Sequence, residues 1–226
     1  MTNRGLFIDF DGTLADNQDV MWNIYLGFLE KYSCQGSKEE FDRLNGPPIT
    51  QGLEKLKLDH NLDESLEHLI DSYNAQIDLN MEVVAPSRNV VIVLEKARQC
   101  DWTICLVTSN QVERVQSWLK RQRLDSYIDA IIGAESVSDW KPHPAPYLFA
   151  LESCKCGPQL SIAVDDSQHG TQSASAAGIR TFGYNANLAL SCHWPAGVEG
   201  IDDLDKLLPI LELPANRAVH AAGKHV

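Results

Sequence analysis

The chain has 226 residues, of which 44% are hydrophobic and 22% are charged, and its formal net charge is −12. These values are typical of a globular protein, and the length suits one large domain or a domain that carries an insertion. The acidic balance, with no basic stretch to offset it, argues against a nucleic-acid partner or an anionic membrane surface.

The cysteine spacing indicates the redox state of the thiols, and the apolar runs indicate whether the chain has a leader or a membrane span. Six cysteines are present, and none forms a C-x-x-C pair or a metal-finger spacing. We therefore expect reduced thiols. No charged-then-apolar leader opens the chain, and no uncharged apolar run approaches membrane-spanning length. The sequence predicts a cytoplasmic protein without a membrane partner.

A short buried strand, Leu6–Ile8, is the first predicted element. Residues 16–85 then change to the spacing of amphipathic helices. Four helices are predicted there, marked by Val20, Ile24 and Phe28, by the capping box Ser37–Glu40, by Ile49, Leu53 and Leu56, and by the start signal Asn61–Glu64. We interpret 16–85 as a helical cap domain inserted into a core of residues 1–15 and 86–213. We expect residues 214–226 to form a flexible tail.

Strands and helices alternate through the rest of the core. Buried strands are predicted at Ile104–Val107, Ile131–Ile132, Ile162–Val164 and Thr181–Tyr184, and helices at Val90–Gln99, Gln111–Leu124, Pro144–Ser153 and Gly170–Ala177. Gly178 is well placed to end the last helix. This alternation predicts an α/β fold with a doubly wound, Rossmann-like parallel sheet covered on both faces.

Two pairs of carboxylates stand where predicted strands end. Asp9 and Asp11 follow the first strand, and Asp165 and Asp166 follow the strand at Ile162–Val164. Ligands of open α/β sheets bind beyond the carboxyl ends of the strands, so we expect the four side chains to gather at one edge. Gathered carboxylates raise one another's pKa unless a cation neutralises them. The sequence therefore predicts a Mg²⁺ site.

Other polar residues reach the same edge, and together they indicate phosphoryl transfer. Thr108, Ser109 and Asn110 follow the second core strand, and Lys141 precedes a predicted helix. A carboxylate can attack phosphorus as a nucleophile. A second carboxylate two residues along an extended segment points the same way and can serve as acid and base. Threonine and lysine side chains would contact the phosphoryl oxygens.

The segment Asp9-Phe10-Asp11-Gly12-Thr13 resembles the first motif of the haloacid dehalogenase-like hydrolase superfamily. Thr108, Lys141-Pro142 and Asp165-Asp166 follow in the order of its second, third and fourth motifs. The helical insertion is similar to the small cap of the subgroup that contains phosphoglycolate phosphatase and beta-phosphoglucomutase. The chain departs from many relatives in two places, with Asp165 and with Arg88-Asn89 where glycine is usual.

The resemblance implies a role for each residue. Asp9 would be the nucleophile and a magnesium ligand, and Asp11 the acid/base, which offers its backbone carbonyl to the metal. Asp165 and Asp166 would complete the metal shell. The phosphoryl group and substrate would be bound by Thr108 and Lys141, with Thr13, Ser109 and Asn110 nearby.

The implied activity is that of a magnesium-dependent phosphatase. It would hydrolyse a small phosphorylated metabolite, such as a sugar phosphate or a phosphoglycolate-like monoester, through an aspartyl-phosphate, as a monomer or homodimer. A phosphosugar mutase of the beta-phosphoglucomutase type and an inactive binding protein are alternatives, and Asp11 argues against a dehalogenase. Arg43, Lys55 and Lys57 of the cap are candidates to contact the substrate.

Overall fold

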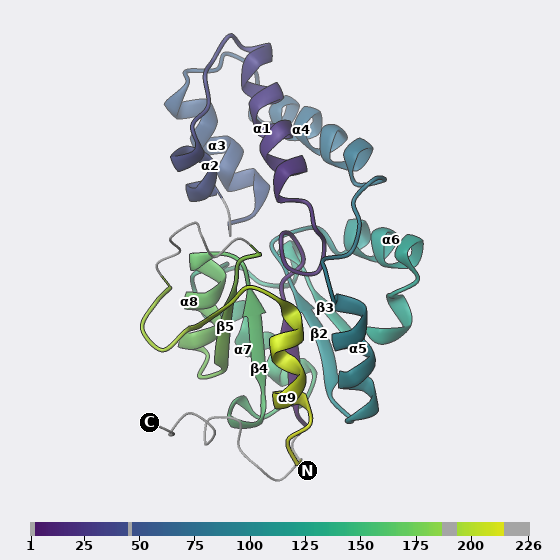
Figure 1. The fold of residues 1–226 in the computed structure, drawn as a ribbon. Coiled ribbons are helices and arrows are strands. Elements are labelled where there is room, and N and C mark those ends of the chain that lie inside the picture. Colours follow the sequence, from purple (N-terminus) through teal and green to yellow (C-terminus); the bar gives the residue numbers. More distant parts are fainter. Residues whose placement is uncertain (1–2, 45–46, 187–193, 215–226) are drawn as a thin grey trace.

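The computed structural model describes residues 3–44, 47–186 and 194–214 (Figure 1). Within these ranges a six-stranded sheet has the strand order β3-β2-β1-β4-β5-β6, and all neighbouring strands are parallel. The strands are β1 (Gly5–Ile8), β2 (Thr103–Val107), β3 (Ala130–Ile132), β4 (Ile162–Asp165), β5 (Arg180–Tyr184) and β6 (Glu199–Ile201). This topology confirms the predicted α/β fold class.

The helices fall into two groups along the chain. The first group comprises α1 (Gln18–Lys31), α2 (Lys38–Leu44), α3 (Ile49–Asp59) and α4 (Leu66–Asn80), which we call the α1–α4 unit. The second comprises α5 (Val90–Gln99), α6 (Val112–Gln122), α7 (Ala145–Ser153), α8 (Gln168–Ala176) and α9 (Leu208–Leu211). No helix in the described ranges is both long enough and apolar enough to span a membrane.

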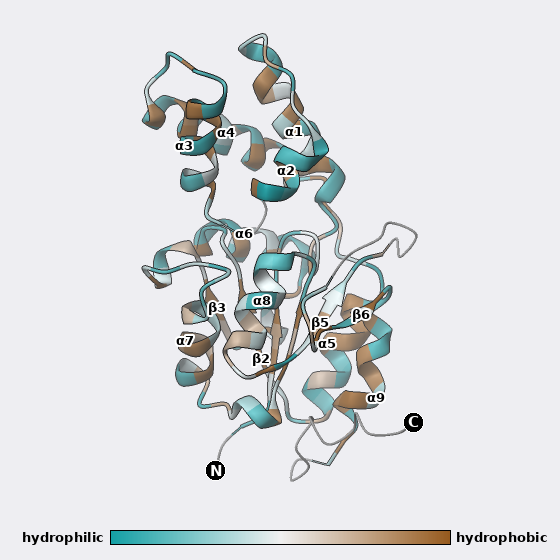
Figure 2. Ribbon diagram, turned by 90° about the vertical axis from the view of Figure 1, so that its left-hand side faces the viewer, coloured by the Kyte–Doolittle hydropathy of each residue, from teal (hydrophilic) through white to brown (hydrophobic). Residues whose placement is uncertain are grey.

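Both faces of the sheet are buried, as the alternation of side chains along β1 shows. Leu6 and Ile8 belong to the core cluster that includes residues of α5, α6 and α9, whereas Phe7 belongs to the cluster beneath α7 and α8. Figure 2 shows hydrophobic strands between α5 and α9 on one side and α7 on the other. Because successive residues of a strand point to opposite faces, a continuous apolar run suits a sheet covered on both sides.

The strand order reverses between β1 and β4, and this reversal places the carboxylates. Ile8 pairs with Val164, and the Asp9 amide donates to the Val164 carbonyl at 3.0 Å. The two chain segments that carry the acidic pairs therefore leave neighbouring strands side by side. In open α/β sheets this switch point is where ligands bind.

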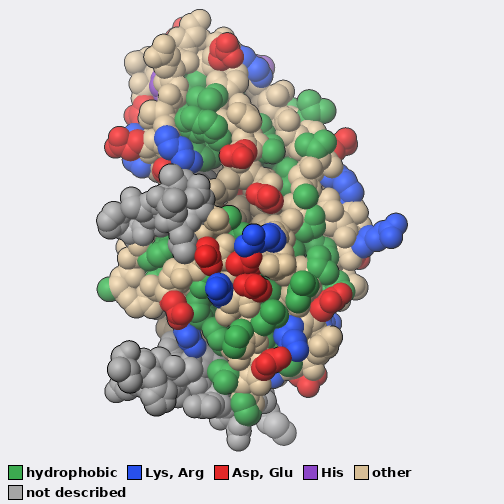
Figure 3. All heavy atoms as spheres, viewed as in Figure 1, with side chains coloured by type: hydrophobic (Ala, Val, Ile, Leu, Met, Phe, Trp, Pro, Cys, Tyr) green, Lys and Arg blue, Asp and Glu red, His purple; other side chains and the backbone are tan. Residues whose placement is uncertain are grey.

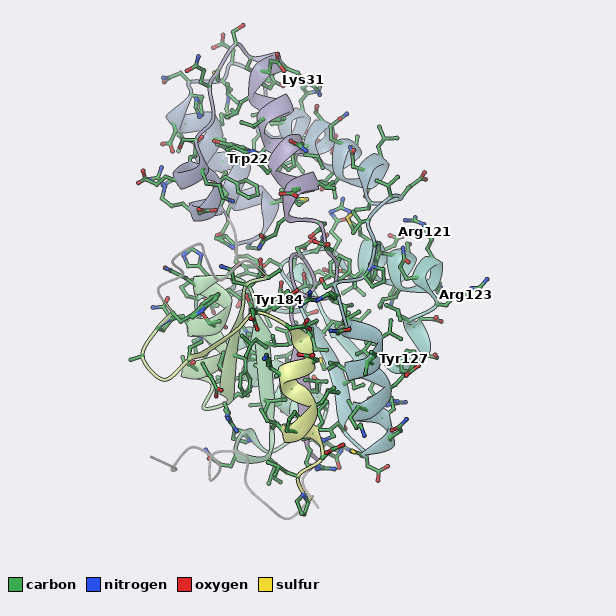
Figure 4. The ribbon with its side chains drawn as sticks, viewed as in Figure 1. Trp22, Lys31, Arg121, Arg123, Tyr127 and Tyr184 are labelled. Carbon is green, nitrogen blue, oxygen red and sulfur yellow. The ribbon has the colours of Figure 1, made fainter. Side chains whose placement is uncertain are left out.

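The α1–α4 unit lies beyond the carboxyl ends of the strands (Figure 1). Its interior is aromatic: the ring centroids of Phe28 and Tyr73 are 5.1 Å apart, and those of Trp22 and Phe41 are 5.3 Å apart. Trp22 accordingly lies on the side of α1 that faces α2 (Figure 4). These contacts give the unit a hydrophobic interior of its own.

Two chain segments join the α1–α4 unit to the core, and they pair with each other. The Asp16 amide donates to the Ala85 carbonyl at 2.9 Å, and the Ser87 amide donates to the Leu14 carbonyl at 2.9 Å. Two backbone connections bonded to each other restrict the unit more than one free linker would.

The start signal Asn61–Glu64 was wrong for α4. The helix begins at Leu66, and Ser65 is its N-cap, since the Ser65 hydroxyl accepts from the His68 amide at 3.2 Å. Asn61 instead occupies a turn with φ of 50°. Several polar residues precede the helix, and each could be its N-cap by type. Because Asn61 is used in a turn, the cap falls on Ser65.

Other local differences are small. Helix α8 starts at Gln168 rather than Gly170, and Gly178 ends it as predicted, with φ of 78°. Asn89 takes φ of 62°, a left-handed conformation that asparagine tolerates, so the backbone keeps a shape that glycine would otherwise provide. Strand β6 was not predicted. The predicted tail lies outside the described residues except for Pro214.

We predict that Phe28→Ala destabilises the protein by about 3–5 kcal/mol, because Phe28 is buried against Tyr73 and its removal leaves a cavity. The measurement is chemical denaturation monitored by circular dichroism. Leu58→Ala is the control, since that side chain is 71% exposed and its loss should change stability by less than about 0.5 kcal/mol. Equal effects of the two changes would contradict the described packing.

Candidate active site

A cavity of about 520 Å³ lies between the α1–α4 unit and the carboxyl edge of the sheet. Seven of the residues predicted for the site line it: Asp9, Asp11, Thr108, Ser109, Asn110, Lys141 and Asp166. Thr13 and Asp165 do not line the cavity, because both are fully buried behind it. The volume is within the range of small-molecule sites in proteins.

Lys141 occupies the centre of the site and is 4% exposed. Its Nζ donates to Asp9 Oδ1 at 2.6 Å, to Asp165 Oδ2 at 2.8 Å and to the Val107 carbonyl at 2.8 Å. Burial alone would lower the pKa of Lys141, but the Asp165 and Asp9 carboxylates outweigh it and hold that pKa well above its ordinary value. The side chain is therefore a fixed positive charge beside Asp9.

Asp165 is fully buried, and both of its oxygens accept hydrogen bonds from the protein. Oδ2 accepts from Lys141 and from the Tyr147 hydroxyl at 3.0 Å, and Oδ1 accepts from the Ser167 amide at 3.0 Å and the Ser167 hydroxyl at 2.8 Å. A carboxylate held by four donors is suited to fixing Lys141 in place. Gly170 makes this possible, because a Cβ at that position would overlap the Asp165 carboxylate.

Asp166 faces the cavity and is contacted by two side chains from the part of the chain that follows β1. The Thr13 hydroxyl lies 3.4 Å from Asp166 Oδ1, and the Gln18 side-chain Nε2 donates to Oδ2. Gly12, with φ of 78°, lies against the same carboxylate, and a Cβ there would overlap it. Burial, with the Asp165 charge added, raises the pKa of Asp166 to about 7. The carboxylate is thus destabilised in its charged form unless a cation is near.

One acidic group among the described residues has the geometry of a cation site. Carboxylate oxygens of Asp9, Asp165 and Asp166 lie within 4.8 Å of one another. Burial raises the pKa of Asp9, and the neighbouring carboxylates add to this effect against the opposing charge of Lys141. Buried oxygens that repel one another are a donor set that a hard divalent cation fits.

Asp11 stands at the cavity wall between two amide groups. Asn17 Nδ2 donates to its Oδ1 at 2.7 Å, and Asn110 Nδ2 donates to its Oδ2 at 3.0 Å. Burial raises the pKa of Asp11 although both amide bonds oppose the shift. A carboxyl group with a raised pKa and a fixed orientation is suited to donating and accepting a proton.

Arg114 of α6 joins the site to the α1–α4 unit. Its NH1 donates to Asn110 Oδ1 at 2.8 Å, while Nε and NH2 donate to Asp78 at 2.6 Å and Asn74 at 3.0 Å in α4. The side chain is only 8% exposed. Asn110 also donates to Asp11. The Arg114 guanidinium therefore links α4, through Asn110, to the Asp11 carboxylate.

The basic residues predicted to contact substrate from the cap do not line the cavity. Arg43 lies 3.8 Å from Glu39, Lys57 donates to the carbonyls of Leu62 and Glu64, and Lys55 is exposed. On the face shown in Figure 3, basic side chains are dispersed among acidic ones rather than gathered into a patch.

Sequence reasoning did not identify several residues that shape the site. They are Asn17, Gln18, Arg114 and Tyr147. Tyr147 lies in a predicted helix close to Lys141, which is a weak signal. No pattern marks Arg114, because its partners Asn74 and Asp78 are distant in the sequence.

We predict that Gly170→Ala lowers kcat by about 100-fold, because the new Cβ displaces Asp165 and with it Lys141. The measurement is steady-state hydrolysis of an aryl phosphate, with thermal unfolding recorded in parallel. Gly27→Ala is the matched control: it lies in α1, and a Cβ there meets no atom within 4 Å. A Gly170→Ala protein as active as the Gly27→Ala protein would refute the assigned packing.

We predict that Arg114→Ala lowers kcat/KM about tenfold, since it removes two hydrogen bonds from the core to α4 and a third to Asn110 within the core. Arg114→Lys should not restore activity, because lysine lacks the planar fork. Arg121→Ala serves as the control, as Arg121 lies on the same helix (Figure 4) and makes a single 3.1 Å bond to the Met81 carbonyl. The measurement is kcat/KM of the purified variants. Full activity of Arg114→Lys would contradict the prediction.

Comparison with known proteins identifies relatives of similar length and fold. The chain is 28% identical over 216 residues to a protein named pyrophosphatase PpaX from Bacillus thuringiensis, with 92% of this chain and 96% of that protein covered. Among solved structures, a beta-phosphoglucomutase-like protein from Thermotoga maritima matches with a TM-score of 0.70 at 23% identity, covering 92% and 98% of the two chains. CbbY from Rhodobacter sphaeroides, solved with xylulose-(1,5)bisphosphate, matches with a TM-score of 0.78 at 17% identity, covering 92% and 96%.

The structural matches are below 25% identity and establish a shared fold. A family model adds the assignment, because the model described as haloacid dehalogenase-like hydrolase matches residues 6–184. That range extends from β1 through the whole of β5 and includes every residue of the site described above. The chain is an enzyme that belongs to the haloacid dehalogenase-like hydrolases.

Proposed function

We propose that this enzyme is a magnesium-dependent phosphatase that hydrolyses a small phosphomonoester through an aspartyl-phosphate on Asp9. The observation that carries the proposal is the Lys141 ammonium group, which is held 2.6 Å from Asp9 Oδ1 by Asp165, with Asp11 at the same cavity. A nucleophile, a fixed cation for phosphoryl oxygens and a proton donor are the groups that phosphoryl transfer requires.

In the first step, a carboxylate oxygen of Asp9 attacks phosphorus and the bond from phosphorus to the alcohol oxygen breaks. Asp11 gives its proton to that oxygen, so the alcohol leaves uncharged. The raised pKa of Asp11 supports this role, because the group must hold a proton until the transfer. Lys141 and the Thr108 hydroxyl would bind the phosphoryl oxygens, on which negative charge is spread.

In the second step, water attacks phosphorus and the bond to Asp9 breaks. Asp11, now ionised, takes the proton from that water, which returns the site to its starting state and releases inorganic phosphate. Asn17 and Asn110 hold the Asp11 carboxylate in one orientation, so the same group can serve both steps.

Asp9 and Asp166, with the backbone carbonyl of Asp11, would hold the magnesium ion. When bound, Mg²⁺ offsets negative charge on the phosphoryl oxygens. Asp165 was predicted as a further ligand and belongs to the same acidic group, but we propose that it fixes Lys141 instead, because both of its oxygens already accept hydrogen bonds from the protein. Magnesium is the proposed cation because carboxylate oxygens are the ligands it prefers in phosphoryl-transfer sites.

The α1–α4 unit would act as a cap that closes over the substrate and excludes bulk water. Its position above the cavity and its link to Asn110 through Arg114 support this role. The five described cysteines are free thiols, which supports the cytoplasm as the place of action.

We predict that Asp9→Asn reduces turnover of any phosphomonoester by at least about 1,000-fold, because the amide cannot attack phosphorus. Acid quenching of the wild-type enzyme during turnover of a ³²P-labelled phosphomonoester should leave labelled protein, and Asp9→Asn should not. Asp16→Asn is the matched control, since Asp16 is an exposed carboxylate of the same segment. Full activity of Asp9→Asn would exclude the proposed mechanism. Return of phosphate to a second hydroxyl without release of inorganic phosphate would identify a mutase.

A further inference from the structure

We infer that the preferred substrate is a phosphate ester of an apolar, uncharged alcohol. This inference rests on the proposed phosphatase function and adds the class of leaving group. It concerns the part of the cavity beyond Asp9 and Lys141, where the alcohol portion of a bound phosphomonoester would lie.

The cap side of the cavity has a hydrophobic surface. Half-buried apolar side chains from four segments of the α1–α4 unit reach it: Met21 of α1, Leu44 of α2, Pro47 of the following turn and Ile49 of α3. Among the described lining residues of this unit, Thr50 and Tyr73 are the two that offer a hydroxyl. A wall of this composition gains free energy by covering apolar carbon and offers few partners for the hydroxyls of a sugar.

The core side adds an aromatic surface next to the phosphoryl site. Trp140 lines the cavity and immediately precedes Lys141. Its indole Nε1 already donates to the Ala134 carbonyl at 2.8 Å, so the ring presents carbon to a ligand. An alcohol group bound between this ring and the cap would be buried on two sides by apolar atoms.

The charges of the cavity disfavour a second anionic group on the substrate. Lys141 and Arg114 are the cationic side chains among the described lining residues, and both are engaged, Lys141 by Asp9 and Asp165 and Arg114 by Asp78. The other charged lining residues beyond the phosphoryl site, Glu113 and Glu135, are acidic. Pyrophosphate, a sugar bisphosphate or phosphoglycolate would therefore meet repulsion, with no free counter-charge among the described lining residues.

A series of primary alkyl phosphates tests this inference, since ethyl, butyl and hexyl phosphate differ in apolar length but have leaving groups of similar acidity. We expect kcat/KM to rise at least about tenfold from ethyl to hexyl phosphate as added methylenes are buried. Hexyl phosphate should also exceed glucose 6-phosphate, phosphoglycolate and pyrophosphate. A flat series, or a preference for any of these three polar compounds, would overturn the inference while inorganic phosphate release still upheld the phosphatase. No turnover of any compound would overturn both.

Two lysine substitutions on α3 locate the effect. Ile49→Lys places a charge in the apolar wall, and it should lower kcat/KM for hexyl phosphate about tenfold and reduce the preference over pyrophosphate. Leu58→Lys is the matched control, because Leu58 is 71% exposed and does not line the cavity. If thermal unfolding shows that Ile49→Lys fails to fold, Ile49→Thr, which keeps the branched Cβ but exchanges the ethyl arm for a hydroxyl, replaces it. Equal profiles for the cavity variant and the control would refute the proposed wall.

Discussion

The buried ammonium group of Lys141 is the interaction on which the rest of the site depends. Two carboxylates, Asp9 and Asp165, lie 2.6 and 2.8 Å from it, and its positive charge offsets the cost of burying their negative charges. Removing one partner of such a pair typically costs about 3–5 kcal/mol, because the other charge stays buried without compensation. The sheet supplies the positions: β1 and β4 are neighbours at the switch point, and the turn before α7 brings the lysine between them. Fold and chemistry are therefore held by the same three charges.

Much of the fold could be predicted from the sequence because the sheet is buried on both faces. Continuous apolar runs such as Ile104–Val107 then mark strands, and helices fill the intervals. Strand β6 escaped prediction, since Glu199 and Gly200 are exposed and give it no apolar run. The start of α4 was misplaced because Asn61 and Ser65 are both acceptable caps by type.

In the site, residues that stand in short sequence motifs could be predicted, and residues defined by contacts distant in the sequence could not. Asp9, Asp11 and Lys141 stand in short motifs, and the parallel topology brings them together. Periodicity could not decide which face of α3 meets the cavity, so Lys55 and Lys57 were candidates. The face of α3 that lines the cavity carries apolar side chains instead, such as Ile49. Arg114 was invisible because its contacts join α6 to α4 across more than thirty residues. Such a contact exists only after both helices have packed.

The space shared by residues 165 and 170 has a consequence for how this enzyme can change over generations. The Asp165 carboxylate fills the volume that any side chain at position 170 would require. A new residue at 170 is thus tolerated only after position 165 has become smaller, and the intermediate then lacks the acceptor that holds Lys141. Each position constrains the other, and a path that changes them one at a time passes through a weakened enzyme. The two sites should be inherited as a pair.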